Sequence, residues 1–153
     1  MRKIMIVDDN YLSAEGIEKN IDWEVLNAEI VHICYNGTSA IEAMKKEPVD
    51  LIISDIEMPD LDGISMSRQA LDINPMVKII LISAYDKFEY ARRALLLGAL
   101  DYIEKPLDYA YLIQKVKNAF ALMEREQRFF YSLRRKVKYK GSCPEYCIGK
   151  SGG

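Results

Sequence analysis

LIISDIEMP, residues 51–59, is an apolar run that ends on a carboxylate and a proline. Residues 51–54 are apolar or small with no polar alternation, which is typical of a strand covered on both faces of a parallel sheet. Asp55 follows at the carboxyl end of that strand, where ligands bind in open α/β sheets. Pro59 stops the strand and opens a turn. The stretch therefore predicts a parallel sheet with Asp55 at its ligand-binding edge.

Length and composition exclude several classes of protein. A chain of 153 residues is long enough for one domain with its own core. Half of the residues are hydrophobic and the net charge is −2, which excludes a wholly disordered chain and a polybasic nucleic-acid binder. No stretch approaches the ~18 apolar residues of a membrane span, and no cleavage-site pattern follows the start. Three cysteines, an odd number, suit a reducing compartment. We therefore expect a soluble, cytoplasmic protein.

Strand and helix patterns alternate along the whole chain. Strands are expected at residues 3–7, 30–34, 51–54, 78–82 and 100–103, and helices at 11–20, 37–44, 63–73, 86–97 and from 108 to about 137. This (βα)5 alternation predicts an α/β fold with a doubly wound, five-stranded parallel sheet in the flavodoxin-like order 2-1-3-4-5, followed by an extended C-terminal helix. We expect a domain over residues 1–123, a helical extension or linker over 124–140 and a disordered tail over 141–153.

Chemically active side chains stand at the carboxyl ends of four of these strands. Asp8 and Asp9 follow the first strand, Asp55 the third, Ser83 the fourth and Lys105 the fifth. Parallel strands bring these ends to one edge, where carboxylates repel one another by roughly 4 kcal/mol per pair at 4 Å with an effective dielectric of 20. A divalent cation relieves that repulsion. Oxygen ligands without histidine or cysteine favour Mg²⁺ or Mn²⁺ over Zn²⁺.

Lys105 and Ser83 suit a phosphoryl group at the same edge. An ammonium and a hydroxyl beside a carboxylate and a metal neutralise the charge of phosphoryl oxygens. With the metal and Lys105 nearby, Asp55 is expected to stay ionised and to act as the nucleophile.

Four motifs together resemble the receiver domain of two-component response regulators, over about residues 3–122. The motifs are IVDD at 6–9, DIEMPDLDG at 55–63, LISA at 81–84 and KP at 105–106. The resemblance implies that Asp55 accepts a phosphoryl group from the phosphohistidine of a sensor histidine kinase. It also implies that Asp9, Asp55 and the backbone carbonyl of Glu57 bind Mg²⁺, with Asp8 acting through water.

The same resemblance assigns roles at the later strands. It implies that Ser83 and Lys105 bind the phosphoryl oxygens, and that Tyr102 is the aromatic residue that turns inward when the Ser83 hydroxyl moves. The switching face is then made by residues 86–97, 100–103 and the final helix. The peptide between Lys105 and Pro106 is expected to be cis, a form whose cost is low before proline.

Residues 21–23 and 83–91 are more closely similar to receivers of regulators with an AraC-type, YesN-like helix-turn-helix output domain. The chain ends about where a linker to that domain begins, so we expect DNA to be contacted only through an output domain outside this chain. We expect no membrane contact.

A homodimer through the switching face or through the C-terminal helix is an additional expectation. That helix carries apolar or small residues in a 4-3 rhythm, interrupted by Glu126, at Leu112, Val116, Ala119, Met123, Phe130, Leu133 and Val137. The other reading of this helix is a frayed segment in solvent.

Two other functions share parts of this pattern. A Mg²⁺-dependent aspartyl phosphohydrolase also uses an aspartyl nucleophile, but Glu57 stands where its second aspartate is needed and no cap insertion is visible. A flavodoxin-like FMN module needs a Ser/Thr/Gly-rich loop after the first strand, where this chain has acids. We therefore expect a phosphorylation-controlled switch rather than an enzyme.

Overall fold

The computed structural model describes residues 1–84, 88–98 and 101–140, and the tail expected to be disordered lies outside these ranges. The chain divides into two compact units, Met1–Ala119 and a second unit that begins at Phe120. The last helix runs from the first unit into the second. Among the described residues, no helix has both the length and the apolar composition needed to cross a bilayer.

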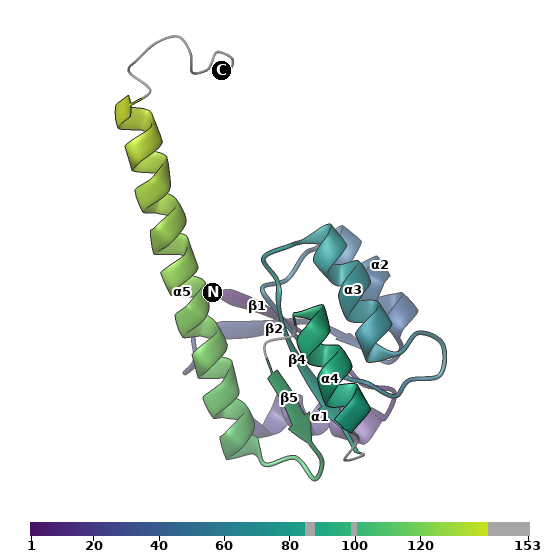
Figure 1. Ribbon diagram of the computed structural model, residues 1–153. Helices are drawn as coiled ribbons and strands as arrows, with labels where there is room; N and C mark the ends of the chain where they lie inside the picture. The colour runs from purple at the N-terminus through teal and green to yellow at the C-terminus, as the bar shows by residue number, and fades with distance from the viewer. Residues whose placement is uncertain (85–87, 99–100, 141–153) are drawn as a thin grey trace. The chain divides into compact units, whose positions relative to one another are not determined.

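Five parallel strands form one sheet in the order β2-β1-β3-β4-β5, as predicted (Figure 1). The strands are β1 (Arg2–Val7), β2 (Ala28–Cys34), β3 (Leu51–Asp55), β4 (Lys78–Ser83) and β5 (Asp101–Glu104). β3 is buried at every position and lies between β1 and β4, which explains its unbroken apolar sequence. Asp55 therefore sits near the middle of the carboxyl edge.

In the described ranges, five helices connect and follow the strands. They are α1 (Tyr11–Asn20), α2 (Gly37–Lys46), α3 (Gly63–Ile73), α4 (Phe88–Leu97) and α5 (Tyr109–Lys140). α5 extends slightly beyond the predicted end near residue 137, and β2 begins two residues before the predicted Ile30. Residues 85–87, part of which was expected in the fourth helix, lie outside the described ranges.

The core lies on both faces of the sheet. Met5 and Val7 of β1 join a buried cluster with residues of α2, α3 and α4. Ile4 and Ile6, whose side chains alternate to the opposite face, are also buried. In the two remaining helices of the first unit, the buried apolar residues are Ala14 and Ile17 of α1 and Leu112, Val116 and Ala119 of α5.

Helices α1, α2 and α3 begin with Asx caps in the loops that leave the carboxyl edge. Asn10 accepts hydrogen bonds from the N–H groups of Leu12 and Ser13, and Asn36 accepts one from Ser39. Asp62 accepts from Ile64 and Ser65 at the start of α3. These caps satisfy backbone donors that have no partner within their helices, so each loop is anchored to the helix that follows it.

Candidate functional site

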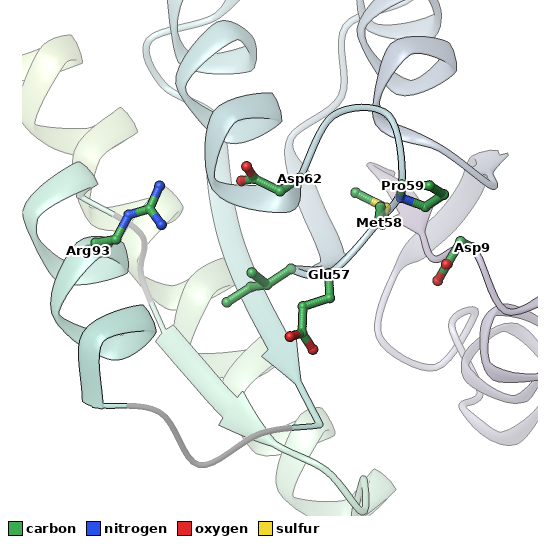
Figure 2. Close-up of a pocket in the computed structure, with 7 residues that line it drawn as sticks. Asp9, Glu57, Met58, Pro59, Asp62 and Arg93 are labelled. Carbon is green, nitrogen blue, oxygen red and sulfur yellow. The ribbon is translucent and has the colours of Figure 1, made fainter.

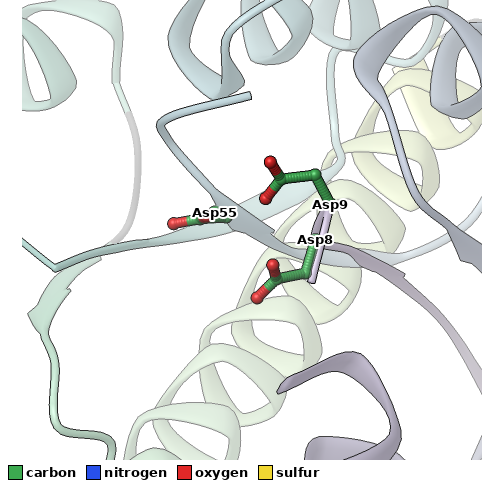
Figure 3. Close-up of side chains that lie close together, drawn as sticks. All are labelled: Asp8, Asp9 and Asp55. Carbon is green, nitrogen blue, oxygen red and sulfur yellow. The ribbon is translucent and has the colours of Figure 1, made fainter. Parts of the chain in front are cut away.

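Three carboxylates converge at the carboxyl edge of the sheet (Figure 3). Asp8 and Asp9 directly follow β1, and Asp55 ends the neighbouring strand β3. One carboxylate oxygen from each residue lies within 4.8 Å of the others. Asp8 and Asp55 are buried, whereas Asp9 is exposed, so the cluster is open to solvent on one side. Oxygen atoms at these separations fit a hard divalent cation such as Mg²⁺.

Backbone groups orient the two buried carboxylates. The N–H of Asn10 donates to Asp8 Oδ1 at 2.9 Å, and the N–H of Ile56 donates to Asp55 Oδ1 at 3.1 Å. Each donor belongs to the turn that follows its strand, so the turn itself holds the carboxylate. The positions of both side chains are therefore set by the backbone.

Lys105 brings one positive charge to these acids. Its Nζ lies 3.7 Å from Asp8 Oδ2 and 3.7 Å from Asp55 Oδ1. The peptide that joins Lys105 to Pro106 is cis, as predicted. The backbone N–H of Lys105 donates to the carbonyl oxygen of Ser83 at 2.8 Å, which ties the ends of β4 and β5 together. Ser83 is fully buried at the end of β4. All the strand-end residues predicted from the sequence thus meet at one edge.

Burial raises the pKa of both inner carboxylates. Desolvation, with a further contribution from the charge of Asp8, raises the pKa of Asp55 to about 6, against the opposing effect of Lys105. Desolvation also raises the pKa of Asp8, and the hydrogen bond from Asn10 partly opposes it. One lysine does not compensate two buried acids. Asp55 is ionised in most molecules at neutral pH, and a bound cation favours that form further.

A pocket of about 430 Å³ opens beside the carboxylates (Figure 2). It is lined by Asp9, Ile56, Glu57, Met58, Pro59, Asp62 and Arg93. Figure 2 shows Arg93 on α4 with its guanidinium directed toward the loop that follows β3. Asp9 is the member of the acidic cluster that faces this pocket, so the cluster is open to solvent there.

Residues 4–117 match the family model described as the response regulator receiver domain. The chain belongs to this family. It is a receiver domain of a two-component system.

Relatives and solved structures agree with this assignment. The transcriptional regulatory protein YesN of Bacillus subtilis is 29% identical over 126 residues, which are 82% of this chain and 34% of YesN. The receiver domain of AraT from Geobacillus stearothermophilus has a TM-score of 0.77 and 35% identity, covering 82% of this chain and 98% of that one. The CheX-CheY-BeF3-Mg²⁺ complex from Borrelia burgdorferi has a TM-score of 0.69 and 27% identity, covering 78% and 89%. The chain thus spans about a third of the curated regulator YesN.

The aromatic residue that the resemblance identified lies on β5 of the receiver. Tyr102 is half-buried and packs against the core cluster. Together with Pro106 and Tyr111 it also lines a second pocket of about 340 Å³. Tyr102 therefore contacts the interior on one side and an open pocket on the other.

Two residues near the receiver's acidic cluster were not predicted from the sequence. Arg93 is the second of two adjacent arginines on α4, and Arg92 pairs with Glu89 in solvent while Arg93 is half-buried and lines the pocket. Asp60, in the loop after β3, accepts hydrogen bonds from the start of α2. Adjacent residues of a helix point in different directions, and this is the signal that could have separated Arg93 from Arg92. Asp60 carries no such signal, because an aspartate after Pro59 is typical of a turn.

Proposed function

We propose that Asp55 of this receiver accepts a phosphoryl group from the phosphohistidine of a sensor histidine kinase, with Mg²⁺ held at the same edge. The observation that carries the proposal is the convergence of Asp8, Asp9 and Asp55 with the ammonium of Lys105. The cation ligands in this proposal are Asp9, Asp55 and the backbone carbonyl of Glu57, with Asp8 acting through water. The Borrelia complex, in which a related CheY is bound with BeF3 and Mg²⁺, supports this choice of metal.

Each residue of the site has a separate role in the proposed phosphoryl transfer. A carboxylate oxygen of Asp55 attacks phosphorus, the bond from phosphorus to the kinase imidazole nitrogen breaks, and that nitrogen takes up a proton from solvent. Bound Mg²⁺ supplies positive charge to the phosphoryl oxygens. Lys105 adds a second positive charge beside Asp55. Ser83 ends the neighbouring strand β4, and in this proposal its hydroxyl donates to a phosphoryl oxygen.

Phosphorylation then acts on the strand ends. The hydroxyl of Ser83 moves toward the phosphoryl group and Tyr102 turns inward. The face made by α4, β5 and α5 then changes the protein surface with which it associates. In thermodynamic terms the phosphoryl group binds one of two existing conformations better and shifts their populations. A homodimer through this face or through the C-terminal helix is the proposed consequence.

The output of this receiver is proposed to be transcription. The matched segment is 34% of YesN, which is a transcriptional regulatory protein. In this proposal, DNA is contacted only through an output domain outside this chain. The comparisons do not support the aspartyl phosphohydrolase considered above.

Intact mass spectrometry tests the acceptor directly. The protein is incubated with Mg²⁺ and phosphoramidate, beside an Asp55→Asn variant. We expect the wild type to gain the mass of one phosphoryl group and Asp55→Asn to gain none. Equal modification of the variant would overturn the assignment of Asp55. Gel filtration with light scattering, before and after beryllofluoride, then measures self-association.

A further inference from the structure

The loop between β3 and α3 is tied to the start of α2. This loop, residues 56–62, carries Glu57, whose backbone carbonyl is a proposed metal ligand. At the tip of the loop, Asp60 Oδ1 accepts a hydrogen bond from the N–H of Gly37 at 3.3 Å, and Asp60 Oδ2 accepts one from the N–H of Thr38 at 3.3 Å. Both donors belong to the first turn of α2, so one carboxylate joins two parts of the chain that are distant in sequence.

Backbone packing reinforces the same junction. A Cβ atom at Gly37 would lie 2.7 Å from Leu61 Cβ and nearer still to the Leu61 carbonyl oxygen. The loop therefore rests directly on the first turn of α2, at a separation that only glycine permits. The hydrogen bonds of Asp60 and the packing of Leu61 on Gly37 both join the loop to the start of α2.

The two ends of the loop are anchored independently. The N–H of Gly63 donates to the carbonyl oxygen of Ile56 at 2.7 Å, which closes the loop at its base. Asp62 caps α3. The contact of Asp60 is thus the hydrogen-bonded anchor that joins the tip to α2.

The carboxylate of Asp60 is ionised at neutral pH. Hydrogen bonds, first from the side chain of Thr38 and then from backbone N–H groups of Leu61, Thr38 and Gly37, lower the pKa of Asp60 to about 2. A carboxylate at a helix N-terminus is also favoured by the helix dipole. The junction is therefore constant rather than switched by pH.

α2 has a cap of its own. Asn36 Oδ1 accepts from the N–H of Ser39 at 2.8 Å, in the usual N-cap geometry. Asp60 is a second acceptor at the same helix end, supplied by the loop beside the acidic cluster. Asn36 and Asp60 accept from different N–H groups at the start of α2, and only Asp60 belongs to the loop.

We propose that Asp60 is a positioning residue for metal binding and for phosphoryl acceptance at Asp55. By holding the loop tip on α2, its carboxylate fixes the backbone at Glu57 relative to Asp9 and Asp55. Asp60 itself contacts neither the metal nor the phosphoryl group. This inference rests on the proposed function, because the ligand it positions is a ligand of the proposed Mg²⁺.

The test compares Asp60→Ala with Asn36→Ala as a matched control. Both variants remove a side-chain acceptor at the start of α2, but only Asp60→Ala releases the loop. Mg²⁺ affinity is measured by NMR titration without a phosphodonor, and Tm is measured beside it. We expect Asp60→Ala to weaken Mg²⁺ binding at least fivefold and to broaden or shift the amide signals of Glu57, Met58 and Leu61. Asn36→Ala should lower Tm and leave Mg²⁺ affinity within twofold of wild type.

Asp60→Asn provides a graded variant, because its amide keeps one acceptor oxygen. It should bind Mg²⁺ with an affinity between those of wild type and Asp60→Ala, and it decides the question if Asp60→Ala does not fold. Unchanged Mg²⁺ affinity in the folded Asp60 variants, or an equal loss in Asn36→Ala, would overturn the inference.

The phosphorylation rate of the same variants separates this inference from the proposed function. If wild-type protein binds Mg²⁺ but takes no phosphoryl group at Asp55, the proposed function fails. The effect of Asp60 on Mg²⁺ affinity is still measured in that case. If wild type is phosphorylated and Asp60→Ala matches it in both readouts, only the inference about Asp60 fails.

Discussion

Lys105 Nζ lies 3.7 Å from Asp55 Oδ1, a separation that forms an ion pair but exceeds hydrogen-bond length. The same ammonium lies 3.7 Å from Asp8 Oδ2. Desolvation raises the pKa of both buried carboxylates, and the one cation shared between them does not offset this effect. The site carries uncompensated negative charge, which a bound divalent cation would neutralise.

Replacing Lys105 by methionine removes the only described ion-pair partner of Asp55 and keeps a side chain of similar length. We expect the rate of phosphorylation by phosphoramidate to fall by roughly 100-fold, because a charged group beside the phosphoryl oxygens is lost. Lys105→Arg keeps the charge and should lose less. Single-turnover rates with saturating Mg²⁺ measure the effect. A Lys105→Met variant as fast as wild type contradicts the role of this lysine.

The stability of the metal-free receiver should depend on the ionisation of Asp55. Its pKa of about 6 in the folded state is above the ordinary value of about 3.9, so ionised Asp55 destabilises the fold. The cost is absent below about pH 4, grows as pH rises toward 6, and is complete above it. Asp55→Asn should therefore be more stable than wild type at pH 7.5, by on the order of 3 kcal/mol, and the difference should vanish near pH 4.

Urea unfolding of both proteins in a chelator, from pH 4 to 8, gives the comparison. Addition of Mg²⁺ at pH 7.5 should stabilise wild type more than Asp55→Asn, since the cation binds the ionised carboxylate. A variant no more stable than wild type at pH 7.5 contradicts the raised pKa.

Gly63 is expected to be intolerant of alanine. A Cβ atom there would collide with the carbonyl oxygen of Asp55 and lie 2.9 Å from the Cα atom of Ile56, both backbone atoms. We expect Gly63→Ala to lower the free energy of unfolding by about 3 kcal/mol and to displace the acceptor strand end. Gly16 is the control, because its nearest neighbour is the hydroxyl of Tyr109, at the free end of a side chain. Gly16→Ala should change stability by no more than about 1 kcal/mol. Denaturant titration of both variants measures these changes in the free energy of unfolding. A Gly63→Ala variant as stable as Gly16→Ala contradicts the prediction.

Much of the receiver fold was predictable because it follows from periodicity and direction. The apolar run that ends on Asp55 indicated a buried parallel strand, and parallel strands necessarily bring their carboxyl ends together. The junction of Asp60 with α2 was not predictable in this way. It depends on how a loop packs against a helix, and neither a turn residue after Pro59 nor a glycine at 37 carries a periodic signal. The raised pKa of Asp55 likewise depends on burial in three dimensions, which the identity of its neighbours in sequence does not show.

The second unit of the chain carries exposed large hydrophobic residues. Phe129, Phe130, Tyr131 and Leu133 of α5 are each more than 40% exposed. Phe130 and Leu133 occupy the 4-3 positions identified in the sequence, whereas Phe129 and Tyr131 do not.

If the helix pairs with a second copy of this chain, Phe130→Ser and Leu133→Ser should weaken self-association at least tenfold, because each removes a buried apolar contact of the pair. Phe129→Ser and Tyr131→Ser are matched controls that should leave it within threefold. Sedimentation equilibrium with and without beryllofluoride measures the dissociation constants. Equal effects at all four positions, or a monomer at every concentration in both states, rule out pairing through this seam.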